Sequence, residues 1–208
     1  MSKTAKSPRA RISASHGIDR RDAVKRLLAE RNGALIVAGL GAPAWDCAAA
    51  GETDDTFYLW GGMGLAASIG LGLALAQPKH RIVVVTGDGE AMMGLGGLAV
   101  VAAERPNNFA MLVLDNEAFG ETGHQPGLSA AGVDLAAAAL GLGFRTTTTV
   151  ATQDALGAVA DLLFRKPGPN LAVLKIQPGE AAKVLPERDG AILARRFRST
   201  LAGFTKKA

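Results

Sequence analysis

Two apolar runs, residues 82–85 and 111–114, constrain the fold of this 208-residue chain more than any other feature. The first run leads into a Gly-Asp-Gly turn whose acid is Asp88, and the second ends just before Asp115 and Asn116. Short continuous apolar runs are typical of strands buried on both faces, as in a parallel sheet. Because neighbouring parallel strands end at one rim of the sheet, Asp88 and Asn116 are predicted to meet there, although 28 positions (116 minus 88) separate them.

Asp88 and Asn116 offer the kind of oxygen atoms that Mg²⁺ prefers. One carboxylate, one amide oxygen and a nearby backbone carbonyl would leave further coordination positions for water and phosphate. Gly87 and Gly89 allow a phosphate to approach the backbone closely, and a helix predicted over 91–103 would point its positive N-terminus at that anion. Either motif alone is more often an ordinary polar turn. The two together, each at a strand end, predict a metal-diphosphate site.

The rest of the chain alternates strands with helices. Strands are predicted at 34–38, 57–59, 81–86, 110–114, 145–150 and 171–176, and helices at 18–31, 63–76, 91–103, 133–140, 151–164 and 191–201. This alternation predicts an α/β fold with a doubly wound, mostly parallel six-stranded sheet and helices on both faces. A ligand then belongs at the carboxyl ends of the strands. Because no internal repeat or low-complexity linker interrupts the pattern, residues 17–208 are interpreted as a single domain.

Composition narrows the class of protein. With 48% hydrophobic and 20% charged residues, the chain can build one substantial core. Its single cysteine, Cys47, excludes an internal disulfide and suits a reducing cytoplasm, so a cytoplasmic location is expected. The aromatic content of 5% argues against nucleic-acid binding, and the glycine-rich apolar stretch 61–77 predicts a buried helix rather than a membrane span. Residues 1–16 carry bases and no acid, which predicts a disordered basic arm, with an organelle-targeting peptide as the alternative.

At these motifs the chain resembles the diphosphate-binding, C-terminal domain of thiamine diphosphate enzymes, in which a Gly-Asp-Gly turn is followed by a metal-binding Asn. The resemblance is closest to the sulfopyruvate and phosphonopyruvate decarboxylase group. Residues 61–78 are similar to the segment that supports the cofactor in that group. Residues 115–123 are similar to its metal loop and the active-site loop beyond it. The resemblance covers about 33–178, and three motifs in the same order make it specific.

The resemblance implies a role for each matching residue. Asp88, the side chain of Asn116 and the carbonyl of Ala118 would bind Mg²⁺. Thiamine diphosphate would also contact Gly61, Gly62, Met63, Gly87, Gly89, Glu90, Phe119 and Gly120.

Among the cofactor contacts, the resemblance implies that Met63 is an apolar wedge that bends the cofactor. The Gly61 carbonyl would accept a hydrogen bond from its aminopyrimidine. Gly89 and Glu90 would offer backbone N–H groups to the diphosphate, which needs no particular side chain. Ordinary core packing is the alternative for Met63.

Several residues depart from the family's pattern. Gly127 ends a Gly-His-Gln-Pro-Gly loop where the related decarboxylases usually have Gly-Gly-Gln-Pro-Thr, so recognition of an anionic substrate tail is open. His124 adds a titratable group beside the expected reaction centre, and the alternative is that it is a solvated loop histidine.

Glu121 matches the family loop and is a candidate for proton transfer, or for a structural hydrogen bond. Glu90 stands where a small residue is commoner, and its charge would repel a diphosphate unless it turns away or pairs with a base. Gly94 replaces an asparagine.

The resemblance implies the cofactor-binding subunit of a thiamine diphosphate- and Mg²⁺-dependent 2-oxo acid decarboxylase. The chain is too short to hold the pyrimidine-binding domain that supplies the activating glutamate. A separate pyrimidine-binding subunit is therefore expected to complete the active site, in a hetero-oligomer of dimers that acts on a small 2-oxo acid. The alternatives are an acetolactate synthase-like carboligase subunit and a non-catalytic, cofactor-binding regulatory subunit. A nicotinamide-binding Rossmann domain is disfavoured because no G-x-G-x-x-G follows the first strand.

Overall fold

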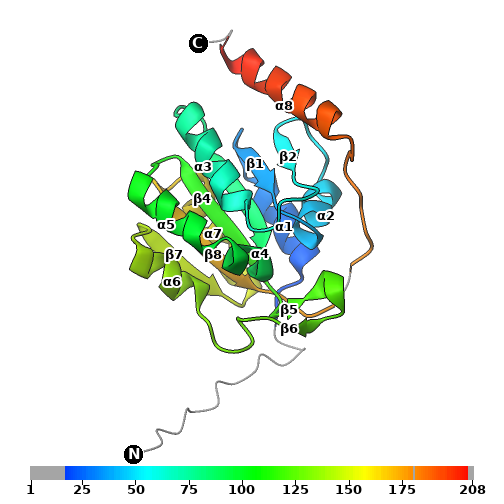
Figure 1. Ribbon diagram of the computed structural model, residues 1–208, viewed down its shortest axis with the longest axis vertical. Helices are drawn as coiled ribbons and strands as arrows, with labels where there is room; N and C mark the ends of the chain where they lie inside the picture. The colour runs from blue at the N-terminus through cyan, green and yellow to red at the C-terminus, as the bar shows by residue number, and fades with distance from the viewer. Residues whose placement is uncertain (1–16, 180, 206–208) are drawn as a thin grey trace, which may run out of the picture.

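The computed structural model describes residues 17–179 and 181–205, and its centre is a six-stranded sheet (Figure 1). The strand order is β2-β1-β3-β4-β8-β7, and every neighbouring pair is parallel. The strands are β1 (Leu35–Ala38), β2 (Thr56–Tyr58), β3 (Ile82–Gly87), β4 (Phe109–Asp115), β7 (Thr146–Val150) and β8 (Asn170–Lys175). The predicted six-stranded α/β sheet is confirmed, and the basic arm predicted at 1–16 lies outside the described residues.

Helices cover both faces of the sheet (Figure 1). One face carries α1 (Arg20–Ala29), α2 (Ala42–Ala49) and α7 (Leu156–Phe164), and the other carries α3 (Ala66–Ala76), α4 (Asp88–Met93), α5 (Leu95–Glu104) and α6 (Leu135–Leu142). The last helix, α8 (Gly190–Thr205), packs beside β2 after a long connection that runs back from the end of β8. None of the helices within 17–179 and 181–205 is long and apolar enough to cross a membrane.

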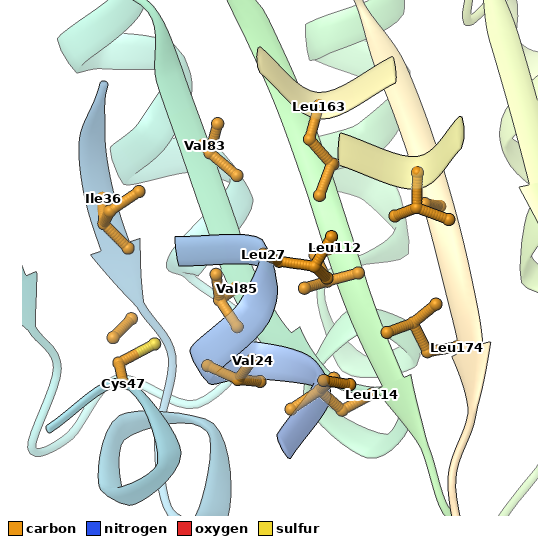
Figure 2. Close-up of a cluster of buried hydrophobic side chains, with 14 of the residues drawn as sticks. Val24, Leu27, Ile36, Cys47, Val83, Val85, Leu112, Leu114, Leu163 and Leu174 are labelled. Atoms are coloured by element: carbon orange, nitrogen blue, oxygen red, sulfur yellow. The ribbon is translucent and has the colours of Figure 1, made fainter. Parts of the chain in front are cut away.

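The period of two along each strand divides the core into two clusters. In β4, Leu112 and Leu114 belong to the cluster under α1 and α7, whereas Met111 and Val113 belong to the cluster under α3 and α5. Figure 2 shows Leu27 of α1 beside Leu112, with Leu114 farther along the strand in the same cluster. Because both faces of β4 are buried, the strand needs an unbroken apolar run, which is the feature that the sequence displays.

The topology switches direction between β1 and β3. These strands are neighbours, but α2 follows β1 on one face while α4 and α5 follow β3 on the other. Connections that leave adjacent strands toward opposite faces open a crevice at the carboxyl ends of those strands. The fold therefore predicts a ligand site beside the ends of β1 and β3.

Several element boundaries differ from those predicted. The helix predicted over 63–76 begins only at Ala66, because Gly62 and Gly64 adopt positive φ in the turn before it. The helix predicted over 91–103 begins earlier, at Asp88, and breaks at Gly94 into α4 and α5. A Cβ at Gly94 would overlap the carbonyl oxygen of Gly64, so these two segments approach too closely for a side chain.

Five short elements were not predicted. Helix α2 covers residues 42–49 after the first strand, where the sequence pattern predicts neither helix nor strand. A small antiparallel hairpin, β5 (Ala118–Phe119) and β6 (Gln125–Pro126), encloses the short 3-10 helix η1 (Gly120–Thr122). A second 3-10 helix, η2 (Gln153–Ala155), occupies the start of the helix predicted over 151–164.

Candidate functional site

A cavity of about 260 Å³ lies at the carboxyl ends of β1, β3, β4 and β8, at the switch in topology. It brings together most of the site residues predicted from the sequence: Met63, Gly87, Asp88, Gly89, Glu90, Asn116, Ala118, Phe119, Gly120, Glu121 and His124. Gly61 and Gly62 do not line it, because they lie exposed in the turn before α3.

Asp88 begins α4 directly after β3, and its side chain is buried in the wall of the cavity. The Oδ2 atom of Asp88 accepts a hydrogen bond from the Ser129 hydroxyl at 2.7 Å. Burial raises the pKa of Asp88 to about 6, since the Ser129 hydrogen bond opposes the shift only in part and the charge of Asp115 adds to it. A buried carboxylate of this kind is stabilised by a bound cation.

Asn116 follows β4 in a loop that several bonds hold in place. Its Oδ1 accepts from the backbone N–H of Ala118 at 3.1 Å, and a second lone pair on this oxygen is available for a ligand. Glu117 adopts a positive φ of 61° between them. The Lys175 ammonium binds both carboxylates that flank Asn116, at 2.6 Å from Asp115 Oδ2 and 2.8 Å from Glu117 Oε1.

Gly127 joins this loop to Asp88. Its N–H donates to the Glu117 carbonyl at 2.8 Å. A Cβ at Gly127 would lie 3.2 Å from Asp88 Oδ2 and 3.4 Å from the nitrogen of Ala118. The predicted ligand Asp88 and the backbone of Glu117 and Ala118 are thus packed around Gly127, the residue that stands in place of the family's threonine.

Phe119 and Met63 cover the turn that follows Asp88. A Cβ at Gly89 would lie 2.9 Å from Phe119 Cε1 and 3.8 Å from Met63 Cε, so the ring leaves no room for a side chain there. The N–H groups of Gly89 and Glu90 lie in the first turn of α4, where a helix provides no acceptors of its own. These N–H groups are therefore available to an anion.

The Glu90 carboxylate is turned toward the end of β1. Its Oε2 accepts from the Thr86 hydroxyl at 2.7 Å and from the Leu40 N–H at 3.0 Å, while Oε1 has no hydrogen-bond partner among the described residues. A Cβ at Gly39 would overlap Oε2, so glycine is needed at that position. Glu90 was expected either to turn away from a diphosphate or to pair with a base. It turns away, toward Thr86 and Leu40, and forms no ion pair among the described residues.

Glu121 and His124 are carried by the hairpin loop over the cavity. Glu121 lies against the start of α2, since a Cβ at Gly41 would be 3.4 Å from its Cγ. His124 adopts a positive φ of 59° and donates its backbone N–H to the Phe119 carbonyl at 3.0 Å. Both side chains are exposed, so each is accessible to a molecule in the cavity.

The donor set suits Mg²⁺ bound together with a phosphate. Within the described ranges, no group of three His, Cys, Asp or Glu side chains could hold a metal ion by itself. One carboxylate, one amide oxygen and a carbonyl instead match a cation that keeps water and takes phosphate oxygens. The first-turn N–H groups of α4 and the absence of a side chain at Gly89 fit the phosphate that this coordination requires.

Sequence reasoning missed the α1 and α2 side of the cavity. Arg20, Pro43 and Trp45 line it and had not been selected. A signal for α2 was present, because Pro43 stands in the first turn just after Gly41, and proline is favoured at helix starts. Ser129, the partner of Asp88, gave no signal of its own.

Comparison with known proteins places this chain in a family. The model of the thiamine pyrophosphate enzyme, C-terminal TPP binding domain, matches residues 51–173. A sulfopyruvate decarboxylase subunit beta from Methanothermobacter thermautotrophicus is 33% identical over 193 residues, which cover 91% of this chain and 98% of that protein. A phosphonopyruvate decarboxylase from Streptomyces hygroscopicus is 41% identical over 178 residues, 85% of this chain but only 44% of its own length.

Solved structures agree on the fold. The thiamine diphosphate-dependent 4-hydroxybenzoylformate decarboxylase of Rhodococcus jostii RHA1 superposes with a TM-score of 0.66 at 20% identity, covering 85% of this chain and 36% of that one. This chain thus spans less than half of that enzyme and of the phosphonopyruvate decarboxylases, but almost all of the beta subunit. The chain belongs to the thiamine pyrophosphate enzymes, as a C-terminal TPP binding domain, and its relatives include phosphonopyruvate and sulfopyruvate decarboxylases.

Proposed function

We propose that this chain is the cofactor-binding subunit of a thiamine diphosphate- and Mg²⁺-dependent 2-oxo acid decarboxylase of the sulfopyruvate or phosphonopyruvate type. The observation that carries the proposal is the convergence of Asp88 and Asn116 on one cavity at the switch in topology. The family supplies the cofactor, and the names of the relatives supply the reaction class.

In this proposal Asp88, Asn116 and the Ala118 carbonyl hold Mg²⁺, and the N–H groups of Gly89 and Glu90 bind the diphosphate. When bound, the cofactor supplies the electron sink that allows a 2-oxo acid to lose carbon dioxide.

The remaining site residues act around the organic part of the cofactor. Met63 supports it from below, while Phe119 and Gly120 close the cavity beside it. Glu121 and His124, on the loop above, are the candidates for moving a proton at the substrate carbonyl.

A separate pyrimidine-binding subunit completes the site in this proposal. The cavity of about 260 Å³ is smaller than the roughly 300–1,000 Å³ of most small-molecule sites, as expected if another polypeptide forms part of the wall. An apolar rim adjoins it: Met63, Leu65, Met93 and Leu95 are between 37% and 67% exposed. Gly61 and Gly62 lie beside that rim, where a part of the cofactor held by the second subunit can reach them. Exposed apolar groups at this density are typical of an interface.

The metal-diphosphate site is tested by calorimetric titration with thiamine diphosphate and MgCl₂. Asp88→Ala and Asn116→Ala are each expected to weaken binding by at least about tenfold, because each removes a ligand of one Mg²⁺ ion. The double variant should bind little worse than either single variant, since residues that act through one ion are not independent. Glu104→Ala, at an exposed acid of α5, is the matched control. Wild-type affinity in either site variant would contradict the proposal.

The division of the site between two subunits is tested by activity. The purified chain with saturating cofactor and Mg²⁺ should release no carbon dioxide from sulfopyruvate, phosphonopyruvate or pyruvate. Addition of the pyrimidine-binding subunit should restore release, and substitution of that subunit's activating glutamate should remove it. Decarboxylation by the isolated chain would contradict this part of the proposal, while condensation products in the complete enzyme would identify a carboligase.

A further inference from the structure

The Arg20 guanidinium is a largely buried cation whose one charged contact among the described residues is the Asp46 carboxylate. Arg20 begins α1, is 9% exposed and lines the cavity. Its Nε lies 3.1 Å from Asp46 Oδ2, but that oxygen takes part in no hydrogen bond within the described ranges, so the contact is an ion pair only. A guanidinium has five N–H donors, and buried charged groups in proteins are almost always hydrogen-bonded. The N–H groups of Arg20 that do not face Asp46 are therefore available to a ligand in the cavity.

The neighbouring Arg21 has hydrogen-bond acceptors for two of its guanidinium nitrogens. Its Nε donates to Asp46 Oδ1 at 3.0 Å, and its Nη2 donates to the Ala182 carbonyl at 2.8 Å. Burial raises the pKa of Asp46 above its ordinary value, and the charges of Arg20 and Arg21 oppose that rise. Two cations thus share one carboxylate, so Asp46 compensates only one of the two positive charges.

Arg20 is the one Arg or Lys side chain among the described residues that line the cavity. The other charged residues of its wall are the acids Asp88, Glu90 and Glu121, and no second Arg or Lys among the described residues lines it. Glu90 accepts hydrogen bonds from the Thr86 hydroxyl and the Leu40 N–H, and among the described residues it forms no ion pair with Arg20. An anion that enters this cavity without a metal ion finds its fixed counter-charge at Arg20.

We propose that Arg20 binds a tetrahedral oxyanion in this cavity: a phosphate, phosphonate or sulfonate group. The planar fork of a guanidinium places two parallel N–H groups against two oxygens of such an anion. Resting on the proposed function, the group has two possible sources, the diphosphate of the cofactor or the acidic tail of the substrate. Both sources present the same chemistry to Arg20, and binding experiments separate them.

The test is calorimetric titration of the full chain with three probes: thiamine diphosphate with MgCl₂, inorganic pyrophosphate, and methylphosphonate added after saturation with cofactor. Arg20→Met is expected to weaken the binding of at least one probe on the order of tenfold, the usual effect of losing a charged hydrogen bond. Arg21→Met is the matched control, because it removes a partner of the same Asp46 carboxylate but not a residue of the cavity wall. It should leave all three affinities within about twofold.

The pattern of losses identifies the source of the oxyanion. Weaker binding of thiamine diphosphate and pyrophosphate in Arg20→Met assigns Arg20 to the cofactor, whereas loss of methylphosphonate alone assigns it to the substrate. Arg20→Lys keeps the charge beside Asp46 and hence the fold, but lacks the fork, so a several-fold loss is expected there too.

Wild-type affinities in Arg20→Met and Arg20→Lys would overturn the inference, and so would equal losses in Arg21→Met. A wild-type chain that binds none of the probes overturns it as well. Failure of the proposed function gives a different result. A chain that binds pyrophosphate through Arg20 but does not bind thiamine diphosphate would contradict the proposed function and support the role of Arg20.

Discussion

Two basic residues of this protein each bridge two carboxylates, in opposite surroundings. Lys175, at the end of β8, lies 2.6 Å from Asp115 Oδ2 and 2.8 Å from Glu117 Oε1. Its side chain is 18% exposed and that of Asp115 only 3%. Burial alone would lower the pKa of Lys175, but Asp115 and Glu117 raise it above its ordinary value. In this cluster the charged form of each of the three side chains is stabilised by the opposite charge beside it.

Arg165 makes the same number of contacts on the surface. It lies 2.8 Å from Asp161 and 2.9 Å from Glu30, and about half of each side chain is exposed. When one partner of an exposed pair is removed, water solvates the other at little cost. When one partner of a buried pair is removed, the remaining charge stays buried and unpaired. Equal distances in the two clusters therefore imply unequal energies.

The buried cluster also lies beside the candidate metal loop. Lys175 binds the residues on both sides of Asn116, and one of them, Glu117, adopts a left-handed backbone conformation that is unfavourable for a side chain of its kind. We expect the ion pair to hold this conformation and, through it, the direction of Asn116 and of the Ala118 carbonyl. Arg165 has no comparable link to the cavity, whose described wall does not include it or its partners.

The largest effect is expected for Lys175→Met, which keeps the length of the side chain and removes its charge. The free energy of unfolding should fall by about 3 kcal/mol, because Asp115 is left buried without its partner. Affinity for thiamine diphosphate with Mg²⁺ should fall as well, and Lys175→Arg should recover most of both losses. Urea denaturation and calorimetric titration measure the two quantities. Lower stability with wild-type affinity in the folded variant would mean that Lys175 does not position the metal loop.

A smaller effect is expected for Glu117→Gln, which removes one arm of the cluster and leaves Lys175 paired with Asp115. Stability should fall by about 1 kcal/mol, the usual contribution of one partly exposed charged hydrogen bond. Cofactor affinity should decrease several-fold, because the backbone at position 117 stays strained but loses the ion pair with Lys175 that stabilises its conformation. The same two measurements apply. A loss equal to that of Lys175→Met would show that Asp115 contributes nothing to the cluster.

The difference in burial between the Lys175 and Arg165 clusters could not be predicted from the sequence. The sheet was predictable because burial on both faces forces continuous apolar runs, as in β3 and β4. The position of Asp88 and Asn116 in the wall of one cavity was predictable as well, since Gly87 pairs with Leu114 and both strands therefore end at the same edge of the sheet. Both predictions rest on periodicity along the chain and on neighbouring strands.

Contacts between distant segments gave no such signal. Lys175 lies 60 positions from Asp115, and a lysine at a strand end is usually solvated, so nothing in the sequence marked it as buried. Arg20 and Ser129 were missed for the same reason, because their roles depend on which segments the fold brings to one cavity. Glu90 was noticed, but its orientation depends on the space left by Gly39, which lies 51 positions earlier (90 minus 39).

The smallest effect is expected for Arg165→Met, the surface counterpart of Lys175→Met. The variant breaks two ion pairs at once, yet Glu30 and Asp161 remain solvated and keep their charges at little cost. Neither the midpoint of urea denaturation nor the affinity for thiamine diphosphate with Mg²⁺ should change measurably. Because salt screens exposed pairs far more than buried ones, adding NaCl should also reduce any residual difference from wild type, but not the difference seen for Lys175→Met. Destabilisation of Arg165→Met to a similar extent as Lys175→Met would show that the number of ion pairs, rather than their burial, sets the stability of this protein.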